Sequence, residues 1–110
     1  NVKRLAPRFA ERVARMDRLP FIGNTRSIGM IGAMEFSSEP DIKAKFDPAH
    51  KIAPRAVAVI QEHGVILRAL PGDIIGFCPP LVINGDELDD MFDRVEAALD
   101  EFTATAESLR

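Results

Sequence analysis

The chain has 110 residues, enough for one domain whose folding buries about two thirds of the surface that the unfolded chain exposes. Hydrophobic residues make up 46% and charged residues 28%, which is typical of a globular domain and excludes disorder, a collagen-like repeat and a disulfide scaffold. The net charge is -3, yet the two ends differ in sign: residues 1–18 hold six basic and two acidic side chains, and residues 84–110 hold nine acidic and two basic ones.

Other global features concern location. No apolar run approaches the ~20 residues of a membrane-spanning helix, and the N-terminus lacks a signal-peptide pattern. The single cysteine, Cys78, cannot form an intramolecular disulfide, which agrees with a reducing compartment. We therefore expect a cytoplasmic protein without a membrane partner. Because the chain opens on Asn1 instead of methionine, we also expect it to be a segment of a longer polypeptide.

The first element is an amphipathic helix that ends before Pro20, with Pro7 expected in its first turn. Its apolar residues recur at three- and four-residue spacing, at Leu5, Phe9, Val13 and Met16. The arginines between them predict a basic face that contacts a neighbouring subunit, another domain or the acidic C-terminal segment. Nucleic acid is not the expected partner, because the net charge is negative and the chain has no Trp or Tyr to stack on bases.

After a turn at residues 23–25, alternating apolar side chains predict one strand from Arg26 to Phe36, apolar on both faces. Gly29 and Gly32 lie inside this strand, where glycine often marks a bulge or a close approach by another backbone. The polar residues 37–50 predict a loop.

A second helix follows this loop, beginning either at Pro48 or near Pro54 and ending at His63-Gly64. Residues 65–70 and 74–78 predict a hairpin around Pro71-Gly72-Asp73, and Pro79-Pro80 stops its second strand.

The last element is a long amphipathic helix. Asn84 is a side-chain N-cap with Glu87 at the third helical position, a capping-box pattern. The apolar stripe runs almost to the end of the chain. Helices and short strands in this order predict an α+β fold, a single domain over residues 1–110 with helices packed on a small, mostly antiparallel sheet.

Few residues offer chemistry of their own. Cys78 with His50 or His63 provides the types for a thiolate and base pair, but a cysteine ending an apolar strand is expected to be a small buried hydrophobe. Their spacings match no common metal site, so we expect no metal. Residues 29–32 lack the third glycine and the helix of a nucleotide-binding loop. The acidic residues 86–96 lack a calcium-binding loop, which favours a solvated helix face.

Two stretches resemble the final domain of class III aminotransferases. Residues 26–36 (RSIGMIGAMEF) and the Asp47-Pro48 pair carry the resemblance, and residues 62–83 (EHGVILRALPGDIIGFCPPLVI), followed by the acidic helix start at Glu87, are similar to the omega-amino-acid and pyruvate branch of that family. The similarity covers nearly the whole chain in the family's order.

This resemblance implies an enzyme that moves an amino group from an amine or omega-amino acid to a keto acid through pyridoxal phosphate, and that is usually a homodimer. It implies that Arg68 grips the substrate carboxylate, a task suited to the planar guanidinium. The Schiff-base lysine and the residues that hold the cofactor belong to the family's large domain, which is absent here. We therefore expect no catalytic, cofactor-binding or metal-binding residue in this chain, and no activity or bound pyridoxal phosphate in the chain alone. The alternative is a free-standing α+β binding or regulatory module without chemistry.

Overall fold

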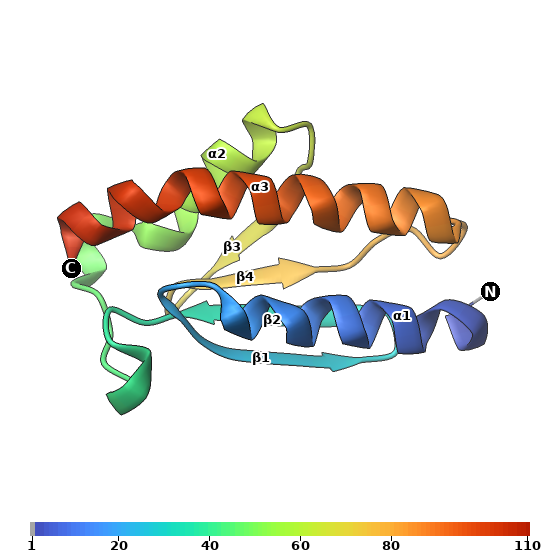
Figure 1. The fold of residues 1–110 in the computed structure, drawn as a ribbon, viewed down its shortest axis with the longest axis horizontal. Coiled ribbons are helices and arrows are strands. Elements are labelled where there is room, and N and C mark those ends of the chain that lie inside the picture. The colour runs from blue at the N-terminus through green and yellow to red at the C-terminus, as the bar shows by residue number, and fades with distance from the viewer. Residues whose placement is uncertain (1) are drawn as a thin grey trace.

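The computed structural model describes residues 2–110, in which four strands and three α-helices form one layer on another (Figure 1). The helices are α1 (Val2–Arg15), α2 (Ile52–Glu62) and α3 (Gly85–Leu109), and the strands are β1 (Ile22–Ile28), β2 (Ile31–Phe36), β3 (Arg68–Leu70) and β4 (Ile74–Phe77). The strands lie in the order β1-β2-β4-β3 and all pairs are antiparallel. The predicted α+β fold with helices on a small antiparallel sheet is confirmed.

The expectation of one strand from Arg26 to Phe36 was wrong. The chain forms a hairpin there, with β1 pairing to β2 and Ile28 opposite Ile31, so residues 23–25 belong to a strand. The two-residue loop is Gly29-Met30, and Gly29 has a φ of 57°. A positive φ at the first loop position matches the twist of a two-residue hairpin, and glycine adopts it at little cost.

The second glycine of this region does lie at a close approach, although to side chains. A Cβ atom added at Gly32 would lie 3.1 Å from Phe9 and 3.1 Å from Val13, both on α1. Because β2 has only a hydrogen at this position, α1 packs directly on the strand.

The helix boundaries follow the sequence closely, with two differences. Pro7 lies inside α1 and not in its first turn, because α1 already includes Val2. Of the two expected starts of α2, the one near Pro54 is confirmed, because α2 starts at Ile52 with Pro54 in its first turn, whereas Pro48 begins a separate 3₁₀ turn, Pro48–His50. Residues 37–50 also include a 3₁₀ turn at Pro40–Ile42, following one at Met16–Arg18 after α1.

The hairpin of β3 and β4 and the start of α3 are confirmed, although β3 begins at Arg68 and not at Val65, and β4 ends at Phe77. The side chain of Asn84 accepts a hydrogen bond from the Glu87 N–H at 2.8 Å, and the Glu87 carboxylate accepts one from the Asn84 N–H at 3.0 Å. Both bonds satisfy N–H groups that a helix start leaves without an intrahelical partner.

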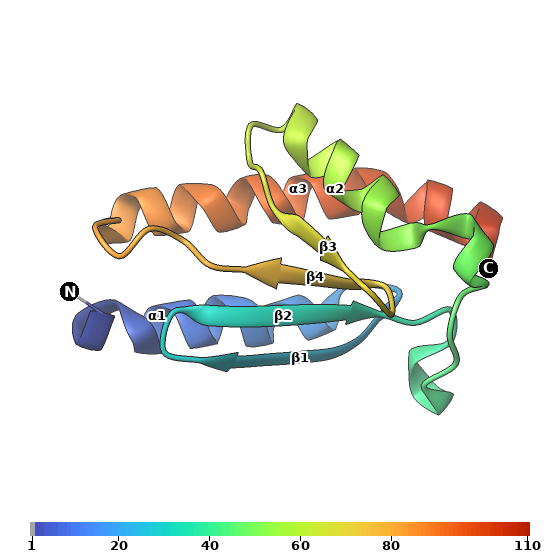
Figure 2. The ribbon, with the colours of Figure 1, turned by 180° about the vertical axis from the view of Figure 1, so that it is seen from behind.

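All three helices cover the same face of the sheet, which the view from behind shows with the strands nearest the viewer (Figure 2). Met34 and Phe36 of β2 and Ile75 and Phe77 of β4 point into this layer and are almost fully buried. The ring of Phe92 on α3 contacts Phe9 of α1 and Phe77 of β4, with centroids 5.6 Å apart in both pairs. The core thus lies between the sheet and the helices.

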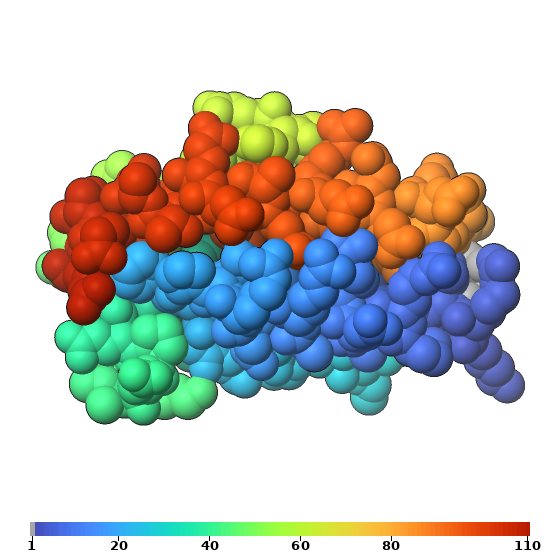
Figure 3. All heavy atoms as spheres, in the orientation of Figure 1, coloured from blue at the N-terminus to red at the C-terminus, as the bar shows by residue number. Residues whose placement is uncertain are grey.

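Opposite charges join the first and last helices, which lie side by side on the surface (Figure 3). The Arg12 guanidinium, only 8% exposed, donates to Asp93 at 2.7 Å and to Glu96 at 3.1 Å. Burial by itself lowers the pKa of Arg12, but the hydrogen bonds to Asp93 and Glu96 outweigh burial and raise the pKa above its ordinary value. Arg15 and Arg18 also donate to Glu96, at 3.1 and 2.6 Å.

The expectation of a solvated acidic face over residues 86–96 holds for Asp86, Asp90 and Asp93, which are exposed, but is wrong for Glu96. Glu96 is 7% exposed and is surrounded by guanidinium groups, although its neighbour Asp90 is exposed and pairs with Arg94. A carboxylate that is buried on folding needs a positively charged or hydrogen-bonding partner, because burial of an unpaired charge costs free energy. Of the three partners left open for the basic face, the acidic C-terminal segment is the one that the structure shows.

Candidate functional site

The face of the sheet opposite the helices carries a groove of about 630 Å³. Its walls come from all four strands and from the segments that flank β3 and β4. The groove is lined by Arg26, Ser27, Ile28, Ile31, Gly32, Ala33, Ile66, Leu67, Arg68, Leu70, Gly76, Phe77, Cys78, Pro79, Pro80 and Met91. Apolar side chains predominate, and arginine is the only charged type among them.

One row of residues crosses this face from edge to edge. Arg26 of β1 is opposite Ala33 of β2, Ala33 is opposite Gly76 of β4, and Gly76 is opposite Arg68 of β3. Residues directly opposite each other in neighbouring strands point to the same side of the sheet. The row therefore places two guanidinium groups at the edges and two small residues between them.

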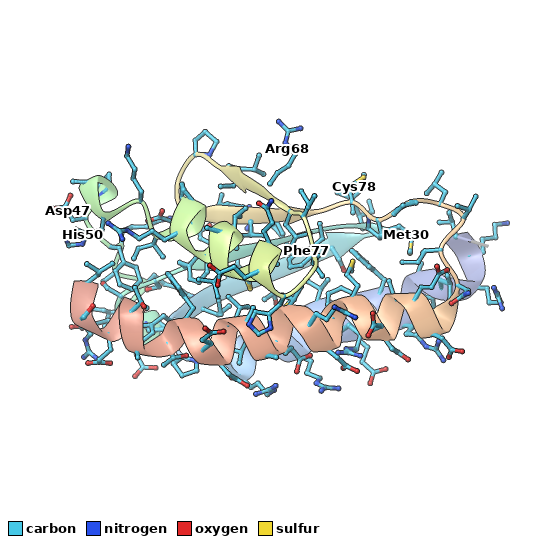
Figure 4. The ribbon with its side chains drawn as sticks, turned by 90° about the horizontal axis from the view of Figure 1, so that it is seen from above. Met30, Asp47, His50, Arg68, Phe77 and Cys78 are labelled. Atoms are coloured by element: carbon cyan, nitrogen blue, oxygen red, sulfur yellow. The ribbon has the colours of Figure 1, made fainter. Side chains whose placement is uncertain are left out.

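Arg68 is exposed and projects from the side of the sheet away from α3 (Figure 4). A substrate carboxylate can therefore reach the Arg68 guanidinium. Within residues 2–110, no carboxylate pairs with it and no hydrogen bond of its side chain is found. An unpaired guanidinium next to an apolar groove can bind an external anion through two parallel N–H donors.

The centre of the groove owes its shape to Gly76. A Cβ atom added there would lie 3.3 Å from Cδ1 of Leu70, so Leu70 already leans over this position. Exposed isoleucines form the rest of the apolar surface: Ile28 and Ile66 are each 80% exposed and Ile31 is 59% exposed. Large exposed apolar side chains gathered in one place usually mark a surface that contacts a ligand or another protein segment.

The expectation for Cys78 was wrong. Cys78 is exposed and borders the groove, because it continues the alternation of β4 after the buried Phe77 and so lies on the same side as Gly76. His50 lies far along the molecule from Cys78 (Figure 4), and His63 is engaged with Glu101, 2.6 Å from Nε2 to the carboxylate. The structure does not bring these residues together as a thiolate and base pair.

The lysines of the chain lie in polar settings. Lys3, Lys43, Lys45 and Lys51 are all exposed. Lys45 pairs with Glu35 at 2.5 Å, and Lys43 donates to the carbonyl of Gly23. A lysine that forms a Schiff base needs a desolvated setting that lowers its pKa, so none of these residues fits pyridoxal phosphate.

Sequence reasoning did not place Arg26 at the groove. Its alternation with Ile28 was visible in the sequence, but reading residues 26–36 as one strand removed the antiparallel partner that aligns Arg26 with Arg68. Recognising Gly29-Met30 as a two-residue hairpin loop would have revealed the row.

The family model of class III aminotransferases matches residues 1–99. Among curated proteins, a diaminobutyrate–2-oxoglutarate transaminase from Halomonas elongata is 42% identical over 85 residues, which cover 76% of this chain and 18% of that protein. A mitochondrial gamma-aminobutyrate transaminase from Solanum lycopersicum is 31% identical over 110 residues, covering 100% of this chain and 21% of that protein. The chain thus spans about a fifth of the length of these relatives.

Solved structures agree with this result. An omega-transferase from Vibrio fluvialis superposes with a TM-score of 0.90 at 36% identity, over 94% of this chain and 24% of that one. An omega-aminotransferase from Paracoccus denitrificans gives a TM-score of 0.89 at 36% identity, over 94% of this chain and 23% of that one.

Proposed function

Because the chain belongs to the class III aminotransferase family, we propose that residues 1–110 form the C-terminal small domain of an enzyme that transfers an amino group from an amine or omega-amino acid to a keto acid. The transaminase relatives support this activity and favour it over a free-standing binding module. One of the similar Vibrio fluvialis structures is described as bound to pyridoxamine phosphate and another as bound to pyridoxal phosphate, which supports pyridoxal phosphate as the cofactor.

The cofactor belongs, in this proposal, to a large domain elsewhere in the same polypeptide. The exposed lysines of this chain are the observation that supports this assignment, since none provides the buried amine that the cofactor requires. The apolar groove would then be covered by that domain, leaving the small domain as one wall of the site. A cytoplasmic homodimer completes the proposal.

In this enzyme Arg68 binds the substrate carboxylate. The observation that carries this role is the unpaired guanidinium at the edge of an apolar groove. Its coplanar N–H donors fix the orientation of a bound carboxylate. Gly76, directly opposite Arg68 on β4, has no side chain and leaves space for the rest of the substrate. Covering the groove excludes water and strengthens the charge-assisted bond. Arg68 thus positions the substrate without exchanging a proton.

The test is Arg68→Ala in the full-length enzyme, with the amine and keto-acid half-reactions measured separately. Charge-assisted hydrogen bonds contribute about 1.5–3 kcal/mol, so kcat/KM for the keto acid should fall roughly ten- to a hundredfold. A simple amine without a carboxylate should lose much less. Arg68→Lys should restore only part of the rate, because ammonium lacks the planar fork.

Arg94→Ala is the matched control, because Arg94 is exposed on α3 and its contacts, an ion pair with Asp90 and a hydrogen bond to the carbonyl of His63, lie away from the groove. Equal losses in both half-reactions of Arg68→Ala would show that Arg68 supports the fold or the dimer, and the proposed role would be wrong.

A further inference from the structure

We propose that Asp73, in the turn between β3 and β4, is a positioning residue that holds β3 in place and thereby fixes Arg68. This inference rests on the proposed function, because it names the residue through which the fold orients the carboxylate-binding arginine. The observation that carries it is a bond between the turn and helix α2: Oδ1 of Asp73 accepts a hydrogen bond from the Ala53 N–H at 3.2 Å. Asp73 acts through β3 and does not itself contact the substrate.

Strand β3 has little packing of its own. It is three residues long and lies at the edge of the sheet, where β4 is its single neighbour within residues 2–110. All three of its side chains are exposed, so no buried side chain fixes the strand against the core. A segment with few buried contacts and solvent-exposed backbone bonds opens easily. The direction of the Arg68 side chain therefore depends on how the two ends of β3 are held.

Both ends of β3 are joined to α2, which runs beside it in the opposite direction (Figure 2). The N-terminal end is joined through the chain itself: α2 ends at Glu62, and the Val65 N–H donates back to the Ile60 carbonyl at 3.3 Å. The C-terminal end is joined through Asp73, whose side chain reaches the first turn of α2. Helix, strand and side chain thus form a closed ring, and removal of one carboxylate opens it.

The first turn of α2 needs an acceptor from elsewhere in the chain. Its N-cap position is occupied by Lys51, whose ammonium group has donors only and cannot accept a bond from a helix N–H. The Ala53 N–H, like those of any first turn, lacks an intrahelical partner. The Asp73 carboxylate accepts from this donor, and its negative charge is favourable at the positive end of the helix dipole. Asp73 therefore does for α2 what an N-cap residue does in other helices.

The backbone around Asp73 ties the same turn to the sheet. The Asp73 carbonyl accepts from the Phe36 N–H at 3.0 Å, and the Gly72 carbonyl accepts from Nζ of Lys45 at 3.3 Å. The φ of Asp73 is 57°, a left-handed conformation that aspartate tolerates better than most residues. Arg68 lies two residues before the last residue of β3, about 7 Å along the strand. A fixed turn therefore fixes the arginine over a short distance.

The experiment compares Asp73→Gly and Asp73→Asn in the full-length enzyme, with the half-reactions of pyruvate and of butylamine measured separately. Glycine adopts the positive φ freely but lacks the acceptor, whereas asparagine tolerates the same φ and keeps a side-chain oxygen. We expect Asp73→Gly to lower kcat/KM for pyruvate about three- to tenfold relative to kcat/KM for butylamine, because a displaced guanidinium loses part of its bond to the carboxylate. Asp73→Asn should stay within about twofold of the wild type.

A double variant tests whether Asp73 acts through Arg68. In an Arg68→Ala background, Asp73→Gly should change kcat/KM for pyruvate by less than about twofold, since the group that it positions is gone. Asn84→Ala is the matched control, because it removes the same kind of bond from the start of α3, a helix that is not joined to β3. This control should lower the Tm and leave the ratio of the two half-reactions unchanged.

Three outcomes overturn the inference: an unchanged ratio in Asp73→Gly, a ratio in Asp73→Asn as low as that in Asp73→Gly, or the full effect of Asp73→Gly in the Arg68→Ala background. Asp73→Ser keeps an oxygen acceptor on a shorter side chain and should give a ratio between those of the other two variants. It decides the question where Asp73→Gly does not fold, and an unchanged ratio would again refute the role. Failure of the proposed function is distinct, because the wild type would then transaminate neither substrate, or Arg68→Ala would slow both half-reactions equally.

Discussion

Removing the carboxylate of Glu96 should destabilise the domain more than any exposed charge does. Glu96→Ala deletes the contacts of one buried carboxylate with the guanidinium groups of Arg12, Arg15 and Arg18. Breaking a buried ion pair costs about 3–5 kcal/mol when the remaining charge has no partner. Arg12 keeps Asp93 at 2.7 Å, and Arg15 and Arg18 are about half exposed and can return to water. We therefore expect a smaller loss, about 2–4 kcal/mol.

The loss can be measured on the 110-residue chain by urea unfolding and by thermal melting followed by circular dichroism. For a domain of this size each kcal/mol shifts the Tm by about 4 °C, so the Tm should fall by about 8–16 °C. Glu107→Ala is the control, because within residues 2–110 Glu107 forms an ion pair only with Arg110, at the exposed end of α3, and the substitution should cost less than about 0.5 kcal/mol.

A double variant tests the reasoning itself. Arg12→Met together with Glu96→Leu replaces the buried pair by apolar side chains of similar volume, which is often neutral in stability. The double variant should therefore be more stable than Glu96→Ala, and a cycle through the single variants should show coupling above about 0.5 kcal/mol. Additive losses would refute the idea that the two charges depend on each other.

Three further changes test other parts of the fold. A hydrogen bond from Lys45 lowers the pKa of Glu35 from its ordinary value of 4.5, and burial opposes this with a smaller effect. The ionised Glu35 therefore stabilises the fold above pH 4.5, and this stabilisation is lost as the pH falls through the lowered pKa. Glu35→Gln should accordingly be less stable than the wild type at pH 7 and equally stable in strong acid, which urea unfolding across that range would show. Gly32→Ala should cost about 1–3 kcal/mol by pressing a methyl group against Phe9, and a melt at or above the wild-type Tm would contradict this packing. Asn84→Ala should cost about 1 kcal/mol through the lost cap, with faster amide exchange confined to the first turn of α3, and uniform exchange would argue against a local role.

The elements with strong local signals could be predicted from the sequence. The cap at Asn84, the turn at Pro71-Gly72-Asp73 and the Pro79-Pro80 stop each act through the backbone of neighbouring residues, so their effect does not depend on distant contacts. The hairpin at Gly29 was missed because apolar residues continue through it. As one strand, residues 26–36 would place Ile28 and Ile31 on opposite faces, whereas the hairpin makes them a cross-strand pair on one face.

Long-range features were harder to predict. Arg68 was named through a family resemblance, and its role stays a proposal. Arg26 acquires its position only from the strand order β1-β2-β4-β3, which no local pattern encodes. The burial of Glu96 likewise depends on the placement of Arg12, 84 residues away in the sequence. The exposure of Cys78 depends on which side of the sheet the helices leave uncovered, and the apolar residues before it do not encode that choice.

The ion pairs between α1 and α3 also set the order of events during synthesis. Arg12 donates to Asp89, Asp93 and Glu96, so α1 leaves the ribosome well before the helix that carries its partners. Pairings of such high sequence separation form slowly, because the chain between them must be ordered first. Until then the apolar stripe of α1 lacks the ring of Phe92 and remains exposed. The domain should thus complete its fold in one late step, and a chain stalled before Asp89 should be recognised by chaperones as unfolded.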